Sequence, residues 1–227
     1  MKNSSIPWKG IGSFIAGFVG VSSLVVAAMS LFFTYNVEKD RLTIDMINHL
    51  ISVLESTKND IFYEYPDVPK GKKRIIPGAL EDSLKEYSEL CNNTKHIEAT
   101  SNAAQGGAKQ LSSGCSKATT RKNARLAVVR RLNYFEGISI AYKKCIINRK
   151  MMDESIGDIF VDFFGSSFEY IKHKVEEKGP TAWGPFIELS CDFNNKMEEP
   201  DSDITAMCND DKLNEKLSIK PIGKCFL

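Results

Sequence analysis

The residues whose types and spacing best suit chemistry lie in one segment, RRLNYFEGISIAYKK, at positions 130–144. On a helix, Asn133 and Glu136 share one largely apolar face, and the opposite face is apolar as well. A helix with two apolar faces is expected to be buried, so Asn133 and Glu136 are predicted to lie inside a domain. A buried carboxylate must be paired or hydrogen-bonded, because taking an isolated charge out of water is costly.

Two interpretations of this carboxylate are open. In the first, which we favour, Asn133, Glu136 and Arg130 form a buried polar network that fixes the register of packed helices. In the second, Glu136 binds a ligand or acts as a catalytic carboxylate with the help of His173, Arg130 or Tyr142.

No catalytic motif supports the second interpretation. The histidines, His49, His96 and His173, are far apart in the sequence, and the cysteines form no C-x-x-C pair. The sequence therefore predicts no catalytic residue, no metal site and no cofactor. An enzyme is less favoured than a binding module.

The cysteines do not decide whether the domain lies in an oxidising compartment. The chain has six, all after residue 90: Cys91, Cys115, Cys145, Cys191, Cys208 and Cys225. An even number is compatible with disulfides in an exported domain. Several fall on predicted buried helix faces, where free cysteine behaves as a small apolar side chain. We favour unpaired thiols, and disulfide bonding stays open.

The composition limits the class of protein. The chain of 227 residues is 42% apolar and 26% charged, with 30 Lys and Arg against 29 Asp and Glu. This balance excludes a disordered tail, a collagen-like fibre and a generally basic nucleic-acid-binding protein, so no nucleic-acid partner is expected.

The charges are unevenly distributed along the chain. Residues 66–150 hold 17 basic and 7 acidic residues, whereas residues 151–227 hold 8 and 16. We interpret this asymmetry first as attraction within the domain, with Arg121 and Arg125 close to acidic residues late in the following long helix. The second interpretation is an acidic face for a partner.

The elements that position these residues begin with an apolar segment. Residues 11–33 contain no charged side chain, and as a helix they would extend roughly 34 Å, enough to cross a hydrocarbon core of about 30 Å. A cleaved signal peptide is the alternative, but its apolar region usually has about 7–15 residues. We therefore predict a transmembrane helix in the lipid bilayer, preceded by a flank at residues 1–10.

The flanking charges bear on orientation. The terminal amine, Lys2 and Lys9 precede the segment, and Lys39 and Arg41 follow it. The excess of one basic group points to an N-terminus in the cytoplasm, but a margin of one charge does not decide the orientation.

A stalk helix is predicted to continue the segment over residues 34–64. Ile44, Ile47, Ile51 and Leu54 recur at spacings of three and four residues. Steps of seven lead backward from Ile51 to Ala16, and Gly12, Ala16 and Gly20 form a small-xxx-small series that permits close helix approach. One hypothesis is a parallel homodimer through the transmembrane and stalk helices. In the alternative, the stripe packs on later helices of the same chain.

The remaining chain is predicted to be helical and to contain most of the core. Proline and glycine predict a loop at 65–78, a helical domain follows at 79–197, and small polar residues predict a flexible loop at 98–120. Long helices are expected at 121–147 and from an Asp153 N-cap to about residue 177. Gly137 indicates close approach of a neighbouring helix, since glycine in a helix costs about 1 kcal/mol relative to alanine.

The second long helix carries the aromatic face expected to fill the core: Ile156, Ile159, Phe160, Phe163, Phe164, Phe168, Ile171 and Val175. The tail at 198–227 is expected to form short helical turns and loops. The fold class is therefore all-α, with a transmembrane helix, a stalk and a bundle of about four to five helices.

Three segments together resemble a known family. They are Arg41-x-Thr43-Ile44-Asp45, the run from Leu132-Asn133-Tyr134-Phe135-Glu136 to Ile140, and Trp183-Gly184-Pro185-Phe186-Ile187. They are similar to a family of small bacterial single-pass membrane proteins with a helical domain of unknown function, most specifically in the Leu-Asn-x-Phe-Glu motif. The similarity covers roughly residues 11–62 and 121–195.

The resemblance implies an all-helical domain tethered to the bacterial inner membrane and facing the cytoplasm, with the periplasm as the alternative. It implies no activity. The expected function is a membrane-anchored protein-interaction or sensing module with an unknown protein partner. The alternatives are a membrane-tethered enzyme that uses Glu136 and a component of a bacterial stress or phage-defence system.

Overall fold

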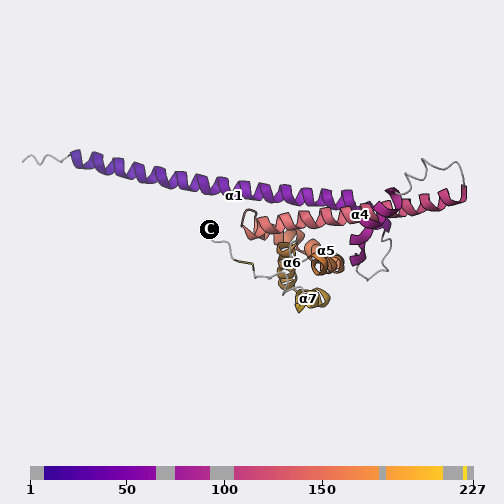
Figure 1. Cartoon of the computed structure of the whole chain (residues 1–227). Helices are drawn as coiled ribbons and strands as arrows, with labels where there is room; N and C mark the ends of the chain where they lie inside the picture. Colours follow the sequence, from indigo (N-terminus) through magenta and orange to yellow (C-terminus); the bar gives the residue numbers. More distant parts are fainter. Residues whose placement is uncertain (1–7, 65–74, 93–104, 179–182, 212–221, 224–227) are drawn as a thin grey trace, which may run out of the picture. The chain divides into compact units, whose positions relative to one another are not determined.

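The computed structural model describes residues 8–64, 75–92, 105–178, 183–211 and 222–223, and every regular element among them is helical (Figure 1). The predicted all-α class is confirmed for this part of the chain. In chain order, the elements are α1 (Trp8–Glu64), the 3-10 helix η1 (Gly78–Asp82), α2 (Ser83–Tyr87), the π-helix η2 (Ser88–Asn92), α4 (Gln105–Lys143), α5 (Arg149–Lys178), α6 (Gly184–Lys196) and α7 (Ser202–Cys208).

The chain divides into two compact units, residues 1–42 and residues 43–227. In the first unit, the described side chains of α1 begin at Leu24. Its large apolar side chains are exposed: Leu24, Val25, Val26, Met29, Leu31, Phe32, Phe33, Tyr35, Val37 and Leu42. Within the described residues, no helix combines the length and the apolarity that crossing a membrane requires.

Several predicted features fall outside the described part of the chain. The side chains of Gly12, Ala16 and Gly20, which form the predicted close-approach face, are among them. So are the N-terminal flank before residue 8, most of the predicted loop at 65–78, and the start of the predicted loop at 98–120.

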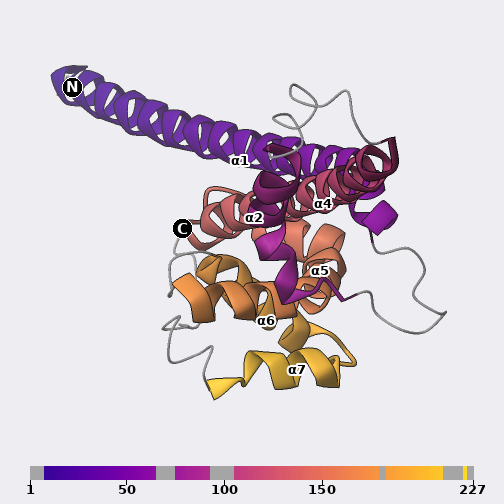
Figure 2. The ribbon, with the colours of Figure 1, turned by 45° about the vertical axis from the view of Figure 1, so that its right-hand side comes forward.

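In the second unit, the stalk part of α1 packs along α4 (Figures 1 and 2). Thr43, Leu50, Val53, Thr57 and Ile61 are buried there. The Arg131 guanidinium of α4 donates from Nε to the Thr57 hydroxyl and from Nη2 to the Leu54 carbonyl, both at 2.6 Å. These contacts hold the two helices side by side.

The apolar stripe predicted for the stalk helix, which comprises Ile44, Ile47, Ile51 and Leu54, is divided between two faces of α1. Ile47 and Leu54 are partly buried against the core beside Leu50. By contrast, Ile44 and Ile51, seven residues apart, are 48% and 43% exposed. The domain's own helices therefore cover one side of the stripe and leave the other in solvent.

Helix α4 is longer at its start than the sequence predicts. It begins at Gln105, so residues 105–120 are helical where a flexible loop was expected. The expected close approach of another helix at Gly137 is also wrong. A Cβ atom at this position would have no atom of a neighbouring element within 4 Å. Gly137 instead lies on the exposed face of the helix.

Helix α5 supplies the largest part of the core, as predicted. Phe160, Phe163, Phe164 and Phe168 are buried, and the Phe135 ring of α4 packs edge-on to Phe160 with centroids 4.6 Å apart. The helix begins four residues before the expected N-cap. Asn148 accepts a hydrogen bond from Met151 N at 3.2 Å in the position typical of a capping residue, and Asp153 lies inside the helix.

A buried ionic cluster joins η1 to α4 and α5. Glu81, which is 7% exposed, accepts hydrogen bonds from Arg125 Nε and Nη2, each at 2.9 Å. It also accepts from the Tyr170 hydroxyl at 2.6 Å and pairs with Lys174. Arg121 and Arg125, which were expected to lie near acidic residues late in the next long helix, form ion pairs with Glu86 of α2 and Glu81 of η1.

The described cysteines are paired, in contrast to the unpaired thiols that we favoured from the sequence. Cys91 in η2 is bonded to Cys115 in α4, and Cys191 in α6 is bonded to Cys208 at the end of α7. Cys145 is disulfide-bonded as well. No free cysteine occurs among the residues that the structure describes.

Candidate functional site: the acidic end of helix α5

The residues singled out from the sequence lie at the contact of α4 with α6. Asn133 Oδ1 accepts a hydrogen bond from Trp183 Nε1 at 3.1 Å, and Glu136 Oε2 accepts one from Phe186 N at 2.9 Å. Asn133 and Arg130 are exposed and Glu136 is half-buried. The three therefore do not form the buried network that was expected, and two of them act separately as acceptors for α6.

Glu136 caps α6 because the residue at the usual capping position cannot. Trp183 occupies that position, with a left-handed backbone at φ 69° and no side-chain acceptor for the first turn. The carboxylate from α4 takes this role and also lies where the helix dipole favours a negative charge. The Leu-Asn-x-Phe-Glu and Trp-Gly-Pro-Phe segments thus meet at a structural contact.

The surroundings of Glu136 change its acidity. Burial raises the pKa of Glu136, and the charge of Glu188 acts in the same direction. The hydrogen bond from Phe186 N and the charge of Lys143 oppose this shift without cancelling it. The carboxyl group is therefore easier to protonate than an ordinary glutamate.

The helpers that catalysis would need are not assembled around Glu136. The Tyr142 hydroxyl is bonded to Asp153 and Lys196, and Arg130 is exposed. His173 packs against Gly78 of η1. The geometry therefore gives no support to catalysis by Glu136 with these residues.

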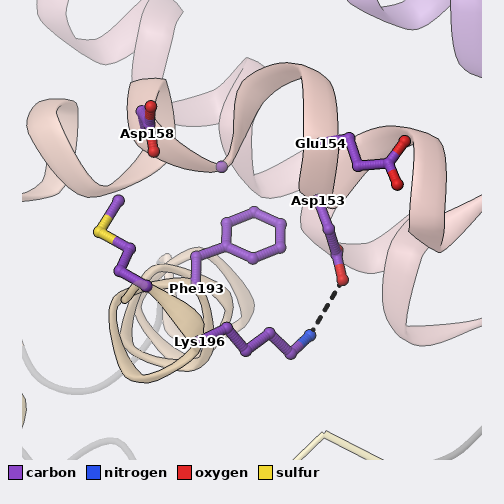
Figure 3. A pocket seen from close by; sticks show the side chains of 7 residues that line it. Asp153, Glu154, Asp158, Phe193 and Lys196 are labelled. Carbon is purple, nitrogen blue, oxygen red and sulfur yellow. Dashed lines mark hydrogen bonds and ion pairs between the residues drawn. The ribbon is translucent and has the colours of Figure 1, made fainter. Parts of the chain in front are cut away.

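A concave site lies instead between the start of α5 and the end of α6 (Figure 3). Its volume is about 310 Å³, and it is lined by Asp153, Glu154, Gly157, Asp158, Phe193, Lys196 and Met197. Figure 3 shows the Phe193 ring between Asp158 on α5 and Lys196 on α6. The pocket thus combines an apolar surface with three carboxylates and one ammonium group.

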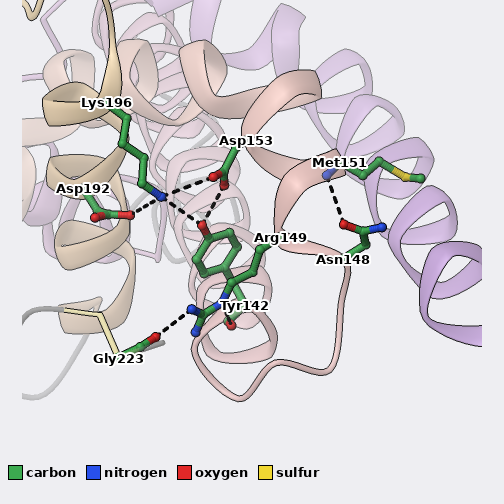
Figure 4. A network of polar contacts seen from close by, with 8 residues as sticks. All are labelled: Tyr142, Asn148, Arg149, Met151, Asp153, Asp192, Lys196 and Gly223. Atoms are coloured by element: carbon green, nitrogen blue, oxygen red, sulfur yellow. Dashed lines mark hydrogen bonds and ion pairs between the residues drawn. The ribbon is translucent and has the colours of Figure 1, made fainter. Parts of the chain in front are cut away.

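A polar network fixes one wall of this pocket (Figure 4). The Lys196 ammonium lies 2.7 Å from Asp192 Oδ2 and 3.2 Å from Asp153 Oδ2. The buried Tyr142 hydroxyl donates to Asp153 Oδ1 at 2.6 Å and accepts from Lys196 at 3.2 Å. The single cation of the pocket is therefore shared between two carboxylates.

The protonation states in this network follow from its contacts. Burial and the hydrogen bond to Asp153 raise the pKa of Tyr142 to about 12. Burial works against the charge of Lys196, but its hydrogen bonds to Asp192 and Tyr142 outweigh this and raise its pKa. At neutral pH the phenol is therefore neutral and the ammonium is charged.

Arg149 anchors the network to the end of α4. Its Nε and Nη2 donate to the carbonyl oxygens of Tyr142 and Lys143 at 2.9 and 3.2 Å, and Nη1 donates to Gly223 O at 2.6 Å. A guanidinium at this position binds carbonyls of the last turn of α4, where backbone donors become few. Figure 4 shows it beside the Tyr142 ring, with its central carbon 4.7 Å from the ring centroid.

The acidic side chains of the pocket continue along α5. Glu154, Asp158, Asp162, Glu169 and Glu176, which we call the acidic stripe, are all exposed. Their spacings of four and seven residues place them on one side of the helix. In the sequence, the surplus of acidic residues after residue 150 was the only sign of this stripe. A count of charges does not show that these residues share one face of a helix.

The chemistry that this site offers is the binding of positive charge. Across the described residues, no three His, Cys, Asp or Glu side chains are grouped to hold a metal ion. Carboxylates on an exposed helix face beside an apolar pocket instead suit the amines and guanidinium groups of basic side chains.

Comparison with known proteins identifies the family. Residues 18–193 match the family described as "Domain of unknown function (DUF4760)". The match covers well over half of the chain, so the chain belongs to this family. No curated protein and no solved structure matches it.

Proposed function

We propose that this member of the DUF4760 family is a membrane-anchored interaction module whose acidic stripe binds a basic segment of a partner protein. The observation that carries the proposal is that the exposed side of α5 is acidic along its length, whereas its other sides are buried in the core. The adjoining pocket of α5 and α6 would hold one basic side chain of the partner.

The acidic stripe has little neutralisation from the domain itself. Among the described residues, its one ion pair is Glu154 with Lys150, at 3.9 Å, and both side chains are largely exposed, at 67% and 84%. Exposed ion pairs of this kind contribute about 0–1 kcal/mol to stability. The nearby lysines pair with other carboxylates, Lys196 with Asp153 and Asp192 and Lys172 with Asp210. The charge of Lys172 also attracts Glu169 and Glu176, so it offsets part of the negative charge there. The rest of the stripe therefore keeps its negative potential for a partner.

The lining of the pocket suits a lysine or arginine side chain. An apolar stem would lie on the Phe193 ring, while the charged end would reach the carboxylates of Glu154 and Asp158. Long basic side chains bury their stems in this way and keep the charged group among polar partners. The partner that fits best is thus a protein segment with several basic side chains.

The membrane anchor in the proposal rests on the sequence and on exposure. Residues 11–33 carry no charge, and the described apolar side chains from Leu24 to Phe33 are exposed around the helix. A helix that is apolar on all sides needs an apolar environment, which a bilayer supplies.

Self-association through α1 is part of the same proposal. Ile44 and Ile51 are exposed at heptad spacing while Leu50 and Val53 face the domain's own core, so a second copy has an apolar seam to cover. Replacing both isoleucines with aspartate should reduce cross-linked dimer in native membranes. Leu126→Asp, at another exposed leucine, is the control, and an unchanged dimer yield in the double variant would contradict self-association.

The interaction is tested with purified full-length chain in detergent and a fluorescent peptide of alternating Lys and Ala. We expect Asp158→Lys/Asp162→Lys to weaken peptide binding by at least about tenfold, because it places like charges opposite the peptide. Binding should also weaken as salt concentration rises.

The matched control is Glu55→Lys/Asp60→Lys, which makes the same charge change at exposed positions of α1. It should leave affinity within about twofold of the wild-type value. Equal loss of binding in both double variants would contradict the acidic stripe as the binding surface and indicate a general charge effect.

A further inference from the structure

The covalent pairing of the cysteines has implications beyond the proposed interaction. Cys91 and Cys115 have Cα atoms 5.1 Å apart, and those of Cys191 and Cys208 are 5.9 Å apart. Both separations lie in the range that a disulfide requires. The residues of each pair are 24 and 17 positions apart in sequence, so these pairs join separate elements and are not neighbours on one helix.

Each bond attaches a short peripheral element to a long helix. Cys191–Cys208 fixes the seven-residue α7 to α6, and α7 contributes one buried apolar side chain, Ile204. Cys91–Cys115 fixes the five-residue η2 to α4. With so little buried area of their own, these elements are stabilised by a covalent link to a long helix.

The pairing favours a structural role for these cysteines over metal binding or thiol reactivity. Metal sites gather three or more ligands, and no such group occurs among the described residues. Reactive thiols must be free, and the described cysteines are not. Disulfides that serve structure persist in oxidising compartments and are rare in the cytosol.

Lysine and arginine are balanced beside the apolar segment, with Lys2 and Lys9 before residues 11–33 and Lys39 and Arg41 after them. The positive-inside rule therefore does not oppose an exported domain, and the disulfides carry the orientation.

We propose that the helical domain is exported and folds in an oxidising compartment, with Cys91–Cys115 and Cys191–Cys208 as structural disulfides and the N-terminus in the cytoplasm. The topological part rests on the membrane anchor of the proposed function. It reverses the cytoplasmic placement that the family resemblance implies.

The chemistry requires an oxidant, and a disulfide-bearing dithiol oxidoreductase supplies it by exchange. For each pair, two thiols of the domain lose two electrons and two protons as the S–S bond forms. The oxidant's disulfide accepts both and becomes a dithiol.

The first test maps the bonds in the full-length protein from native membranes. Cells are lysed in N-ethylmaleimide to block free thiols, and the protein is digested without reduction for mass spectrometry. We expect linked peptides for both pairs, each absent after reduction. Maleimide on Cys91, Cys115, Cys191 and Cys208 in the native protein would overturn the proposal.

A variant pair separates the bond from the side chains. Cys191→Ser leaves Cys208 open to maleimide, whereas Cys191→Ser/Cys208→Ser does not. Reduction should lower the melting temperature of the wild-type chain by about 5 °C or more, and the double variant should already melt at a lower temperature. An unchanged melting temperature in both experiments would overturn the structural role.

Topology is tested with alkaline phosphatase fused after Leu227, because this enzyme is active only outside the cytoplasm. Activity in the membrane fraction supports both the anchor and the orientation. Activity in a soluble periplasmic fraction supports export but contradicts the anchor, so failure of the proposed function is recognised separately. A phosphatase that is inactive although expressed would overturn the proposed orientation.

Discussion

The carboxylate of Glu136 and the backbone amide of Phe186 form a 2.9 Å hydrogen bond that joins α4 to the first turn of α6. The capping acceptor thus comes from a residue 50 positions earlier in the chain. Phe135, next to Glu136, packs on the ring of Phe186 with centroids 5.2 Å apart. A polar and an apolar contact together set where α6 begins.

Removing this cap should destabilise the domain by a modest amount. We expect Glu136→Ala to lower the free energy of unfolding by about 1 kcal/mol, the usual cost of losing a capping acceptor. Glu136→Gln should lose less, because its amide oxygen can still accept from Phe186 N. Urea denaturation followed by circular dichroism measures both, and equal losses would contradict the capping role.

The raised pKa of Glu136 predicts a dependence of stability on pH. Because burial raises the pKa in the folded state, the folded protein binds the proton more tightly than the unfolded chain does. Stability therefore falls as pH rises from the unfolded value near 4.5 through the folded pKa. Glu136→Gln lacks this titration.

Melting temperatures of the wild type and Glu136→Gln between pH 4 and pH 7 test this dependence. As the pH rises, the melting temperature of Glu136→Gln should increase relative to that of the wild type. A constant difference across the range would show that the carboxyl group has an ordinary pKa.

Substitution of Glu81 should be much more damaging than substitution of Glu86. Glu81→Gln removes the buried carboxylate that Arg125 and Lys174 both bind, and breaking a buried ion pair typically costs about 3–5 kcal/mol. Glu86 pairs with Arg121 at a side chain 34% exposed, so Glu86→Gln should cost about 0–1 kcal/mol. Denaturation of the two variants side by side measures the difference, and similar losses would mean that the Glu81 cluster is hydrated.

Two glycines are expected to respond to alanine in opposite directions. At Gly137 the added methyl group meets open space on an exposed helix face, so Gly137→Ala should stabilise by about 1 kcal/mol. At Gly78 the new Cβ atom would lie 2.6 Å from His173 Cβ, so Gly78→Ala should destabilise by about 1–3 kcal/mol. Thermal melts of both variants test the contrast.

The sequence was sufficient to predict the helical class and most of the core. The phenylalanines of α5 follow helical periodicity, and such a stripe has few alternatives to burial. It was not sufficient for the polar partners. Glu136 was expected to join a polar network with Asn133 and Arg130, but its partner is the backbone amide of Phe186, which side-chain patterns do not reveal.

Ion pairs and disulfides between distant segments could not be predicted from the sequence either. Arg125 was assigned to acidic residues of the next helix because charge totals give no geometry, and its partner is Glu81 in η1. The cysteines have no motif spacing, so their pairing depends on how α6 and α7 pack. The prediction at Gly137 was wrong because a helical glycine can mark either close contact or an exposed backbone.

The exposed side of α5 is narrow, and the rest of that helix is enclosed by aromatic side chains. In the proposed function, folding and recognition therefore depend on different residues of the same helix. Charge changes along the acidic stripe would then alter the choice of partner while leaving the core undisturbed.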